Sequence, residues 1–251
     1  MKKDFYFGKT VVITGAASGM GLLSSQTLCS AGATVVMCDV NALRLKEEVD
    51  AINAKGSGRA IASVCDVRRY HDAVAAAETA MRETGRIDIL ITCAGGYEPR
   101  MCGSFVPFYE QPVEVLDWGI DVNLKGAVYF ARACMPPMVK AGSGVICCLG
   151  SVTGFEGDGN GAMYGTAKSG LFNFVKGVAQ AGASHGVRAF CVTPGPVLTR
   201  PGMAGMKTLL GRAANPSEIV DFILYLCSDR AAFITGTNHV IDGGRLSMQP
   251  Q

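Results

Sequence analysis

Tyr164 and Lys168 stand four residues apart and form the pair in this sequence best suited to proton transfer. On a helix, side chains at this spacing share one face, so the phenol and the ammonium would be neighbours. A nearby cation stabilises a phenolate and brings the pKa of tyrosine down from its usual ~10. The pair therefore indicates a general acid or base that works near neutral pH, and an inert surface pair is the competing interpretation.

Ser151 favours the chemical interpretation. It directly follows the apolar run Gly144–Gly150, which we expect to be a strand. Open α/β sheets bind their ligands at the carboxyl ends of strands, so the serine hydroxyl would hold a substrate oxygen beside the phenol.

A glycine-rich segment, Thr14–Gly21, follows another expected strand and leads into a helical pattern. Glycines at such a turn let a pyrophosphate approach the positive end of the helix. The spacing G-x-x-x-G-x-G differs from the commoner G-x-G-x-x-G, and ordinary turns use glycine as well. Asp39 ends the next strand about 20 residues later, where a carboxylate accepts hydrogen bonds from an adenosine ribose. Together they predict a dinucleotide site, although a plain strand-end aspartate remains the alternative for Asp39.

Two further strand ends should open onto the same crevice. Asp66 ends the third run, where it would contact the adenine amine or cap the following helix. The fourth run ends in Ala94 and Gly95.

Short β-branched runs alternate with longer segments of helical spacing, a pattern typical of a parallel sheet. The expected strands are Thr10–Thr14, Ala33–Asp39, Ala60–Asp66, Asp88–Ala94, Gly144–Gly150, Val187–Pro194 and His239–Asp242. The expected helices are Gly21–Ser30, Ala42–Ala54, Tyr70–Thr84, Val113–Ala141, Ala162–Ser184 and Pro216–Ser228, the last with Asn215 as its cap. Because the runs are apolar on both faces, helices should cover both sides. We predict an α/β fold, a single-domain Rossmann-type doubly wound parallel sheet of about seven strands that spans residues 1–251.

Composition excludes several classes of protein. The formal net charge is +2 with no basic run, which argues against a nucleic-acid partner. No segment has the ~18 apolar residues of a membrane span, and the N-terminus lacks a signal pattern. The ten cysteines form no C-x-x-C pair and only three histidines occur, so we expect reduced thiols in a cytoplasmic protein without a metal site.

In combination, these motifs resemble the short-chain dehydrogenases/reductases along nearly the whole chain. The matching elements are Thr14–Gly21, Asp66, Ala94-Gly95, Asn123, Ser151, Tyr164 with Lys168, and Pro194-Gly195 with Thr199. The resemblance implies a catalytic tetrad of Asn123, Ser151, Tyr164 and Lys168. Tyr164 would exchange the proton, Ser151 would orient the substrate oxygen, Lys168 would bind the nicotinamide ribose and acidify Tyr164, and Asn123 would hold a proton-relaying water.

The same resemblance implies the residues that hold the dinucleotide. They are Gly15, Ser18, Gly19, Met20, Gly21, Asp39, Asp66, Val67, Ala94, Gly95, Tyr164, Lys168, Pro194, Gly195, Val197 and Thr199. A carboxylate at position 39 would repel the 2′-phosphate of NADP, and Ala17, Val40 and Asn41 offer that phosphate no basic group. We therefore predict NAD as the cofactor.

The chain departs from the family pattern at two places. Thr92 and Cys93 stand where the family commonly has two asparagines before its A-G, which puts hydrogen bonding beside the cofactor in doubt. Phe190 replaces the family's usual asparagine before Pro194-Gly195, a change expected to affect packing.

We expect an NAD(H)-dependent oxidoreductase that interconverts a secondary alcohol and a ketone. From the resemblance we expect substrate loops near 96–110, 152–161 and 195–211. These loops contain charged, aromatic and methionine side chains, a mixture that suits a polyol or sugar as well as an alicyclic or steroid-like substrate. The short segment Arg200–Leu210 suggests an open site.

The second hypothesis for the function is a 3-oxoacyl-carrier-protein reductase. It ranks below the first because Tyr129 and Gln180 stand where arginines for an acidic carrier would be expected. A non-catalytic dinucleotide sensor is the third hypothesis, and the family resemblance also suggests a homo-oligomer, a tetramer or dimer.

Overall fold

In the computed structural model, which describes residues 5–248, seven strands form one sheet in the order β3-β2-β1-β4-β5-β6-β7. All neighbouring strands pair in parallel. The strands are β1 (Thr10–Thr14), β2 (Thr34–Asp39), β3 (Arg59–Val64), β4 (Ile89–Thr92), β5 (Gly144–Leu149), β6 (Val187–Pro194) and β7 (Thr237–Ile241). The predicted doubly wound parallel sheet is confirmed.

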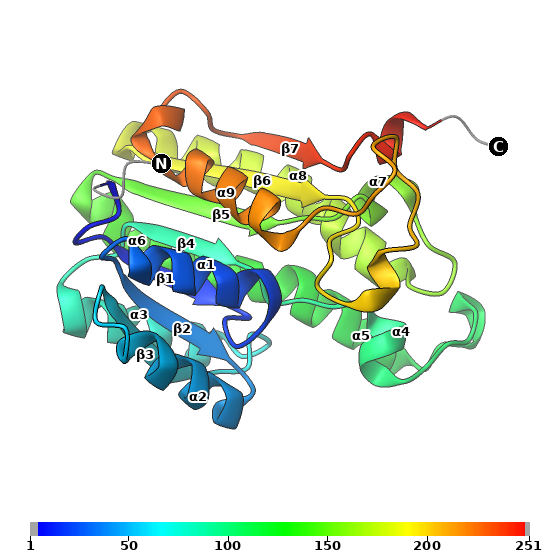
Figure 1. Cartoon of the computed structure of the whole chain (residues 1–251), viewed down its shortest axis with the longest axis horizontal. Coiled ribbons are helices and arrows are strands. Elements are labelled where there is room, and N and C mark those ends of the chain that lie inside the picture. Colours follow the sequence, from blue (N-terminus) through cyan, green and yellow to red (C-terminus); the bar gives the residue numbers. More distant parts are fainter. Residues whose placement is uncertain (1–4, 249–251) are drawn as a thin grey trace.

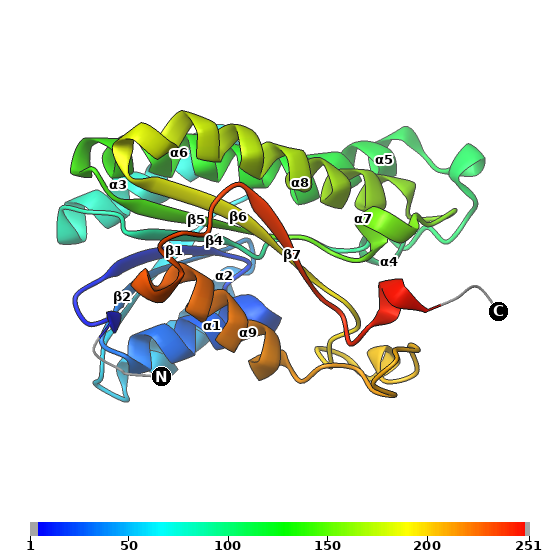
Figure 2. The same ribbon diagram turned by 90° about the horizontal axis from the view of Figure 1, so that it is seen from above.

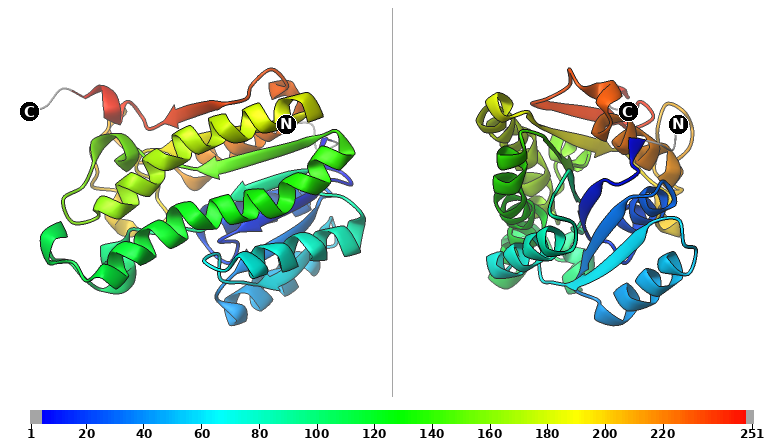
Figure 3. Two further views of the ribbon diagram at one scale, coloured as in Figure 1. Left: turned by 180° about the vertical axis from the view of Figure 1, so that it is seen from behind. Right: turned by 90° about the vertical axis from the view of Figure 1, so that its left-hand side faces the viewer.

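Nine α-helices occur within the described range: α1 (Gly19–Ser30), α2 (Ala42–Asn53), α3 (Tyr70–Thr84), α4 (Glu98–Cys102), α5 (Val113–Ile120), α6 (Gly126–Ala141), α7 (Thr153–Glu156), α8 (Ala162–Gly182) and α9 (Pro216–Cys227). Figure 2 shows the sheet between two helical layers, with α1, α2 and α9 on one face and α3, α6 and α8 on the other. The long helices α6 and α8 run side by side across that second face (Figure 3).

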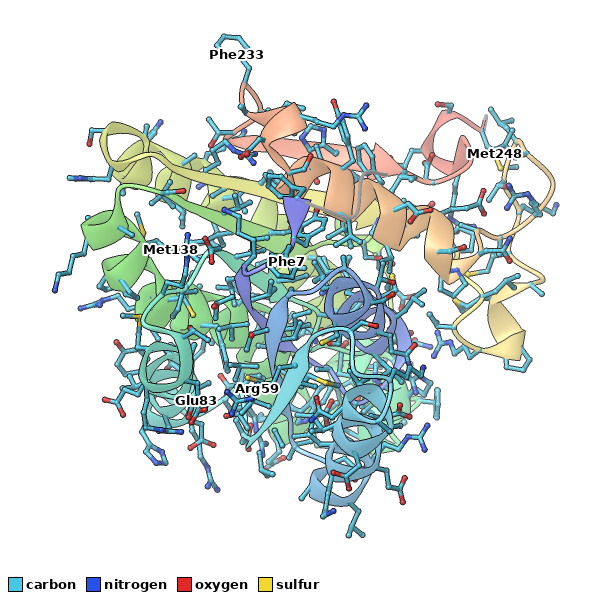
Figure 4. The ribbon with its side chains drawn as sticks, turned by 60° about the vertical axis from the view of Figure 1, so that its left-hand side comes forward. Phe7, Arg59, Glu83, Met138, Phe233 and Met248 are labelled. Atoms are coloured by element: carbon cyan, nitrogen blue, oxygen red, sulfur yellow. The ribbon has the colours of Figure 1, made fainter. Side chains whose placement is uncertain are left out.

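Two buried clusters hold the layers together, and β1 contributes to both. Val11 and Ile13 pack beneath α1, α2 and α9, whereas Val12 packs beneath α3, α6 and α8. Burial on both faces explains why successive strand residues are apolar instead of alternating. At the edge of the sheet, Arg59 of β3 and Glu83 of α3 point toward one another (Figure 4) and form an ion pair of 2.7 Å.

The sheet grows outward in two directions from β1 and β4, which places a crevice at their carboxyl ends. The loops that carry α4, α7 and residues 195–211 gather at this end of the molecule (Figure 1). These segments include the predicted substrate loops, whose role stays a prediction, and the sequence did not predict the short helices α4 and α7 within them.

The predicted continuous helix over Val113–Ala141 is wrong in its middle. A π-helical turn, Asp121–Lys125, separates α5 from α6. Within it, the Asn123 side-chain amide donates to the Gly119 carbonyl at 2.9 Å and so competes with the regular backbone ladder. Smaller differences occur at strand ends: β3 stops at Val64 and β7 begins at Thr237. The predicted start of α9 is confirmed, because the Asn215 N–H donates to Glu218 Oε2 at 2.8 Å in a capping box.

All ten cysteines are free thiols. Eight are buried within the two clusters or beside them, Cys93 is half-buried, and Cys102 at the end of α4 is exposed. Burial raises the pKa of the Cys134 thiol to about 12. No group of three or more metal-ligating side chains occurs among residues 5–248, and none of the helices described there is long and apolar enough to cross a bilayer.

Candidate active site

Two cavities of about 480 and 450 Å³ lie at the carboxyl ends of the strands. They share Met20, Cys93, Gly95, Leu149, Thr199 and Arg200, so they form one groove. We call the part beside β1 and β2 the cofactor cavity and the part beside β5 and β6 the catalytic cavity.

The glycine-rich loop forms the floor of the cofactor cavity. Gly15 has a φ of +65°, and a Cβ there would lie 2.8 Å from the Ala94 nitrogen. A Cβ on Gly21 would lie 2.2 Å from the Gly15 carbonyl oxygen. Helix α1 begins at Gly19 without a side-chain cap from Ser18, which leaves its positive end available to an anion. The loop therefore fits the pyrophosphate of a dinucleotide.

Asp39 lies at the wall of the same cavity. Its Oδ2 accepts the Ala17 N–H and its Oδ1 accepts the Asn41 N–H, each at 3.0 Å. The carboxylate thus ties the end of β2 to the glycine-rich loop at the place predicted for the adenosine ribose. Arg44, the first basic residue after it, pairs with Glu47 at 3.2 Å.

Asp66 and Val67 also line the cofactor cavity, and Asp66 is held by Arg68. Arg68 Nη2 donates to Asp66 Oδ2 at 2.6 Å, and this contact lowers the pKa of the Asp66 carboxyl. The alternative role of Asp66 as a cap for α3 is wrong: its side chain accepts the Arg68 N–H, whereas α3 begins only at Tyr70. The adenine contact stays a prediction.

The catalytic cavity brings together Ser151, Tyr164 and Lys168. Lys168 Nζ lies 5.5 Å from the centre of the Tyr164 ring and donates to the Leu149 carbonyl at 2.7 Å. The lysine is only 4% exposed, so its ammonium is shielded from bulk solvent. Ser151 Oγ accepts the Thr153 N–H at 3.2 Å, which orients its hydroxyl.

Asn123 is the predicted tetrad member that does not line either cavity. It is buried, its Oδ1 accepts the Gly96 N–H at 2.8 Å, and its Nδ2 donates to the Gly96 carbonyl at 2.9 Å. A Cβ on Gly95 would lie 2.6 Å from Asn123 Oδ1 and 3.3 Å from Lys168 Nζ. The amide therefore holds the β4 loop against the lysine, and its predicted water stays a prediction.

The end of β6 and the segment after it also line the catalytic cavity, through Pro194, Gly195, Val197 and Thr199. The Gly195 N–H donates to the Ile241 carbonyl at 3.0 Å, and a Cβ there would lie 2.8 Å from Asp242 Cα. Met203 and Met206 also line this cavity. Although the loop is short, it covers one side of the site.

The two departures from the family pattern have different outcomes. The buried Thr92 Oγ1 has no hydrogen-bond partner among the described residues, whereas the Ala94 N–H is satisfied by Thr14 Oγ1 at 3.1 Å. Cys93 lines both cavities. Phe190 is fully buried beneath α9, in line with the expected packing role.

Sequence reasoning missed several residues of the groove. Trp118, Val122 and Arg68 line the cofactor cavity, and the Leu149 carbonyl holds Lys168. Glu98 falls within the loop predicted near 96–110, yet its carboxylate caps the helix that carries Tyr164. The sequence did indicate that this helix needs a cap from another segment, because Gly161, which precedes it, has no side chain to provide one.

Comparison with known proteins agrees with this geometry. A family model described as enoyl-(acyl carrier protein) reductase matches residues 15–245. Trans-4-hydroxycyclohexanecarboxylate dehydrogenase of Sinomonas cyclohexanicum is 35% identical over 248 residues, which cover 94% of this chain and 92% of that protein. The 7alpha-hydroxysteroid dehydrogenase of Bacteroides fragilis is 29% identical over 253 residues, with coverage of 94% and 93%. The structure of a 3-oxoacyl-[acyl-carrier protein] reductase with bound NAD from Brucella melitensis has a TM-score of 0.88 and 30% identity, and the match covers 97% of this chain and 93% of that one.

Proposed function

Because the chain belongs to the short-chain dehydrogenase/reductase family, we propose that it oxidises an alicyclic secondary alcohol with NAD, or reduces the matching ketone with NADH. The observation that carries the proposal is the cavity in which Ser151, Tyr164 and Lys168 meet, next to the cavity lined by the glycine-rich loop and Asp39. The relatives bear out the predicted class, an oxidoreductase that acts on CH–OH groups, and the predicted cofactor.

The four residues of the tetrad have distinct tasks. NAD, when bound along the glycine-rich loop and Asp39, supplies the hydride acceptor. In oxidation the Tyr164 phenolate takes the proton from the alcohol, and in reduction the protonated phenol gives it to the ketone oxygen. Ser151 Oγ orients that same oxygen. Lys168 would hold the nicotinamide ribose, and it places positive charge beside the phenol. Asn123 keeps the β4 loop in register with the lysine.

The direct test is a panel of secondary alcohols and ketones, followed by the absorbance of NADH. We expect turnover of cyclohexanol-type or hydroxysteroid substrates with NAD. A chain that binds NADH but turns over no member of the panel would instead be the non-catalytic sensor.

Ser151→Ala is expected to lower kcat about 100-fold, as does the loss of one donor to a reacting oxygen. Steady-state kinetics with the best substrate of the panel measure it. If only KM rises and kcat is unchanged, Ser151 merely binds the ground state.

Arg100 and Arg200 support a substrate that carries a carboxylate. Both line the groove, and Arg200 lines the catalytic cavity as well. Neither forms an ion pair within the described part of the chain. Burial and the charge of Arg200 lower the pKa of Arg100, so the two cations are close enough to repel each other. An anionic group between them would relieve that repulsion.

We expect 4-hydroxycyclohexanecarboxylate to be used with a kcat/KM about 10-fold above that of its neutral carboxamide, a difference of about 1.4 kcal/mol. Arg200→Gln should bring the ratio close to one while the affinity for NADH, measured by fluorescence, changes little. A variant that binds NADH weakly and loses both substrates equally would show that Arg200 contacts the cofactor's phosphates instead.

Reduction of a 3-oxoacyl group on a carrier protein remains the second candidate, supported by the Brucella melitensis structure. Tyr129 packs edge-on against Tyr70, and Gln180 is exposed, so neither position offers a cation to an acidic carrier. Activity with a 3-oxoacyl carrier protein and NADPH above that with alcohols and NAD would favour this candidate.

We further propose that the protein works in the cytoplasm as a homo-oligomer. Ten reduced cysteines support a reducing compartment. An apolar surface groove between α6 and α8, lined by Val128, Met135, Val139, Phe174 and Val178 among others, supports self-association. Light scattering coupled to gel filtration measures the assembly.

A further inference from the structure

We infer that Glu98 positions Tyr164 for proton transfer by capping the helix on which Tyr164 stands. The inference rests on the proposed function, because it assigns a task within that reaction. Glu98 itself lines neither cavity, so it acts through Tyr164 and not on the substrate.

The Glu98 carboxylate caps helix α8 in place of the residue that precedes the helix. Helix α8 begins at Ala162, after Gly161, which makes no side-chain hydrogen bond. Two of its first backbone donors instead bond to Glu98: the Met163 N–H donates to Oε1 at 2.9 Å, and the Tyr164 N–H lies 3.1 Å from both carboxylate oxygens. The catalytic tyrosine thus has its own backbone held by a residue 66 positions away.

The carboxylate is tightly enclosed. Glu98 is 0% exposed, and none of the cations in the described range forms an ion pair with it. A buried charge requires compensation, and the positive end of the 21-residue helix α8 provides it. Space for the side chain comes from Gly119 of α5, where a Cβ would lie 3.4 Å from Glu98 Cδ and 2.7 Å from Met163 Cβ.

The contacts extend from Glu98 back to Asn123 through Gly96 and Tyr97. Asn123 holds both backbone groups of Gly96. Tyr97 donates its hydroxyl to Asp158 Oδ1 at 2.8 Å, and the same oxygen accepts the Gly161 N–H at 2.7 Å. The three residues Gly96–Glu98 therefore join Asn123 to the start of α8.

Loss of this cap should displace Tyr164 selectively. Lys168 stands one turn farther along α8 and is anchored independently to the Leu149 carbonyl. Tyr164 lies in the first turn, where a helix without a cap frays. Because a misplacement of ~1 Å costs up to ~100-fold in rate, fraying should impair the proton step while the cofactor still binds.

The experiment compares Glu98→Ala and Glu98→Gln with Glu218→Ala, which removes the capping carboxylate of α9 together with its ion pair to Arg212. Glu218 lines neither cavity. Glu98→Ala should lower kcat about 30-fold, change the Kd of NADH less than ~2-fold and raise the primary deuterium isotope effect on alcohol oxidation. Glu98→Gln keeps one acceptor oxygen and should recover part of the rate. Glu218→Ala should lower the Tm without a change in the isotope effect.

Hydrogen exchange gives a readout that does not need turnover. The Met163 and Tyr164 amides should exchange faster in Glu98→Ala, with the helix beyond Lys168 unchanged. Unchanged exchange at these amides, or a loss of activity that tracks the folded fraction with a constant isotope effect, would overturn the inference. If the wild type turns over no secondary alcohol while these amides do respond, the proposed function fails and the positioning contact stands.

Discussion

Tyr164→Phe is expected to lower kcat by about 1,000-fold or more, because the variant keeps the ring and loses the group that exchanges the proton. Its affinity for NADH should stay within ~2-fold of wild type, since the hydroxyl contributes to chemistry more than to cofactor binding. The edge-on contact of this ring with Tyr97, at 6.1 Å between centres, does not involve the hydroxyl and should persist. Single-turnover kinetics and fluorescence titration measure the two quantities separately.

Tyr129→Phe is a matched control, because Tyr129 stands on α6 outside both cavities. This variant should retain wild-type kcat. Substantial residual turnover in Tyr164→Phe would remove Tyr164 from its assigned role.

Cofactor preference is the second large effect. Wild type should favour NAD over NADP by about 100-fold or more in kcat/KM. The 2′-phosphate of NADP carries close to two negative charges. At ~5 Å from Asp39 and an effective dielectric of about 20, the repulsion costs ~3 kcal/mol for each pair of charges, and screening by solvent reduces this energy to roughly half. Val40, which follows Asp39, is 71% exposed and lines the cofactor cavity, so an arginine there would reach the phosphate. Asp39→Ala should erode the preference, and Asp39→Ala with Val40→Arg should move it toward NADP.

A backbone contact of Asp39 calls for a control variant among the Asp39 substitutions. Because Asp39 also accepts the Ala17 N–H, its removal loosens the glycine-rich loop as well as removing a charge. Asp39→Asn retains an oxygen for that hydrogen bond and loses only the acceptor for the Asn41 N–H, so its NAD/NADP ratio reports mainly the loss of charge. Equal use of both cofactors by wild type would mean that Asp39 does not face the ribose, and the cofactor assignment would then be withdrawn.

The elements of the fold were predictable because each has a local cause. Strand residues such as Val11, Val12 and Ile13 are buried from both sides, so an uninterrupted apolar run already indicates a covered parallel strand. The carboxyl ends of those strands must share one edge of the sheet. For that reason Gly15, Asp39, Ser151 and Gly195 could be assigned to one groove without coordinates.

Features that depend on contacts between distant segments were not predictable in this way. Asp121–Lys125 has ordinary helical spacing in the sequence. The long-range contact that accompanies the π turn there is the pairing of Asn123 with Gly96. In the sequence, Glu98 looks like a solvent-exposed loop carboxylate, and only the fold brings it into contact with the start of α8. Likewise, the sequence separates Arg100 from Arg200 by about a hundred positions, and only the folded groove brings the two charges together.

The distribution of thiols makes this chain suited to site-selective labelling. Cys102 is the single exposed cysteine of the ten, and it ends the short helix that Glu98 begins. Partial burial and the nearby Glu98 charge raise the pKa of the Cys102 thiol, so a maleimide should react slowly at neutral pH and faster as the pH rises. A fluorophore attached there would sit on α4 without any engineered cysteine, and its emission would report movement of the segment that holds the start of α8.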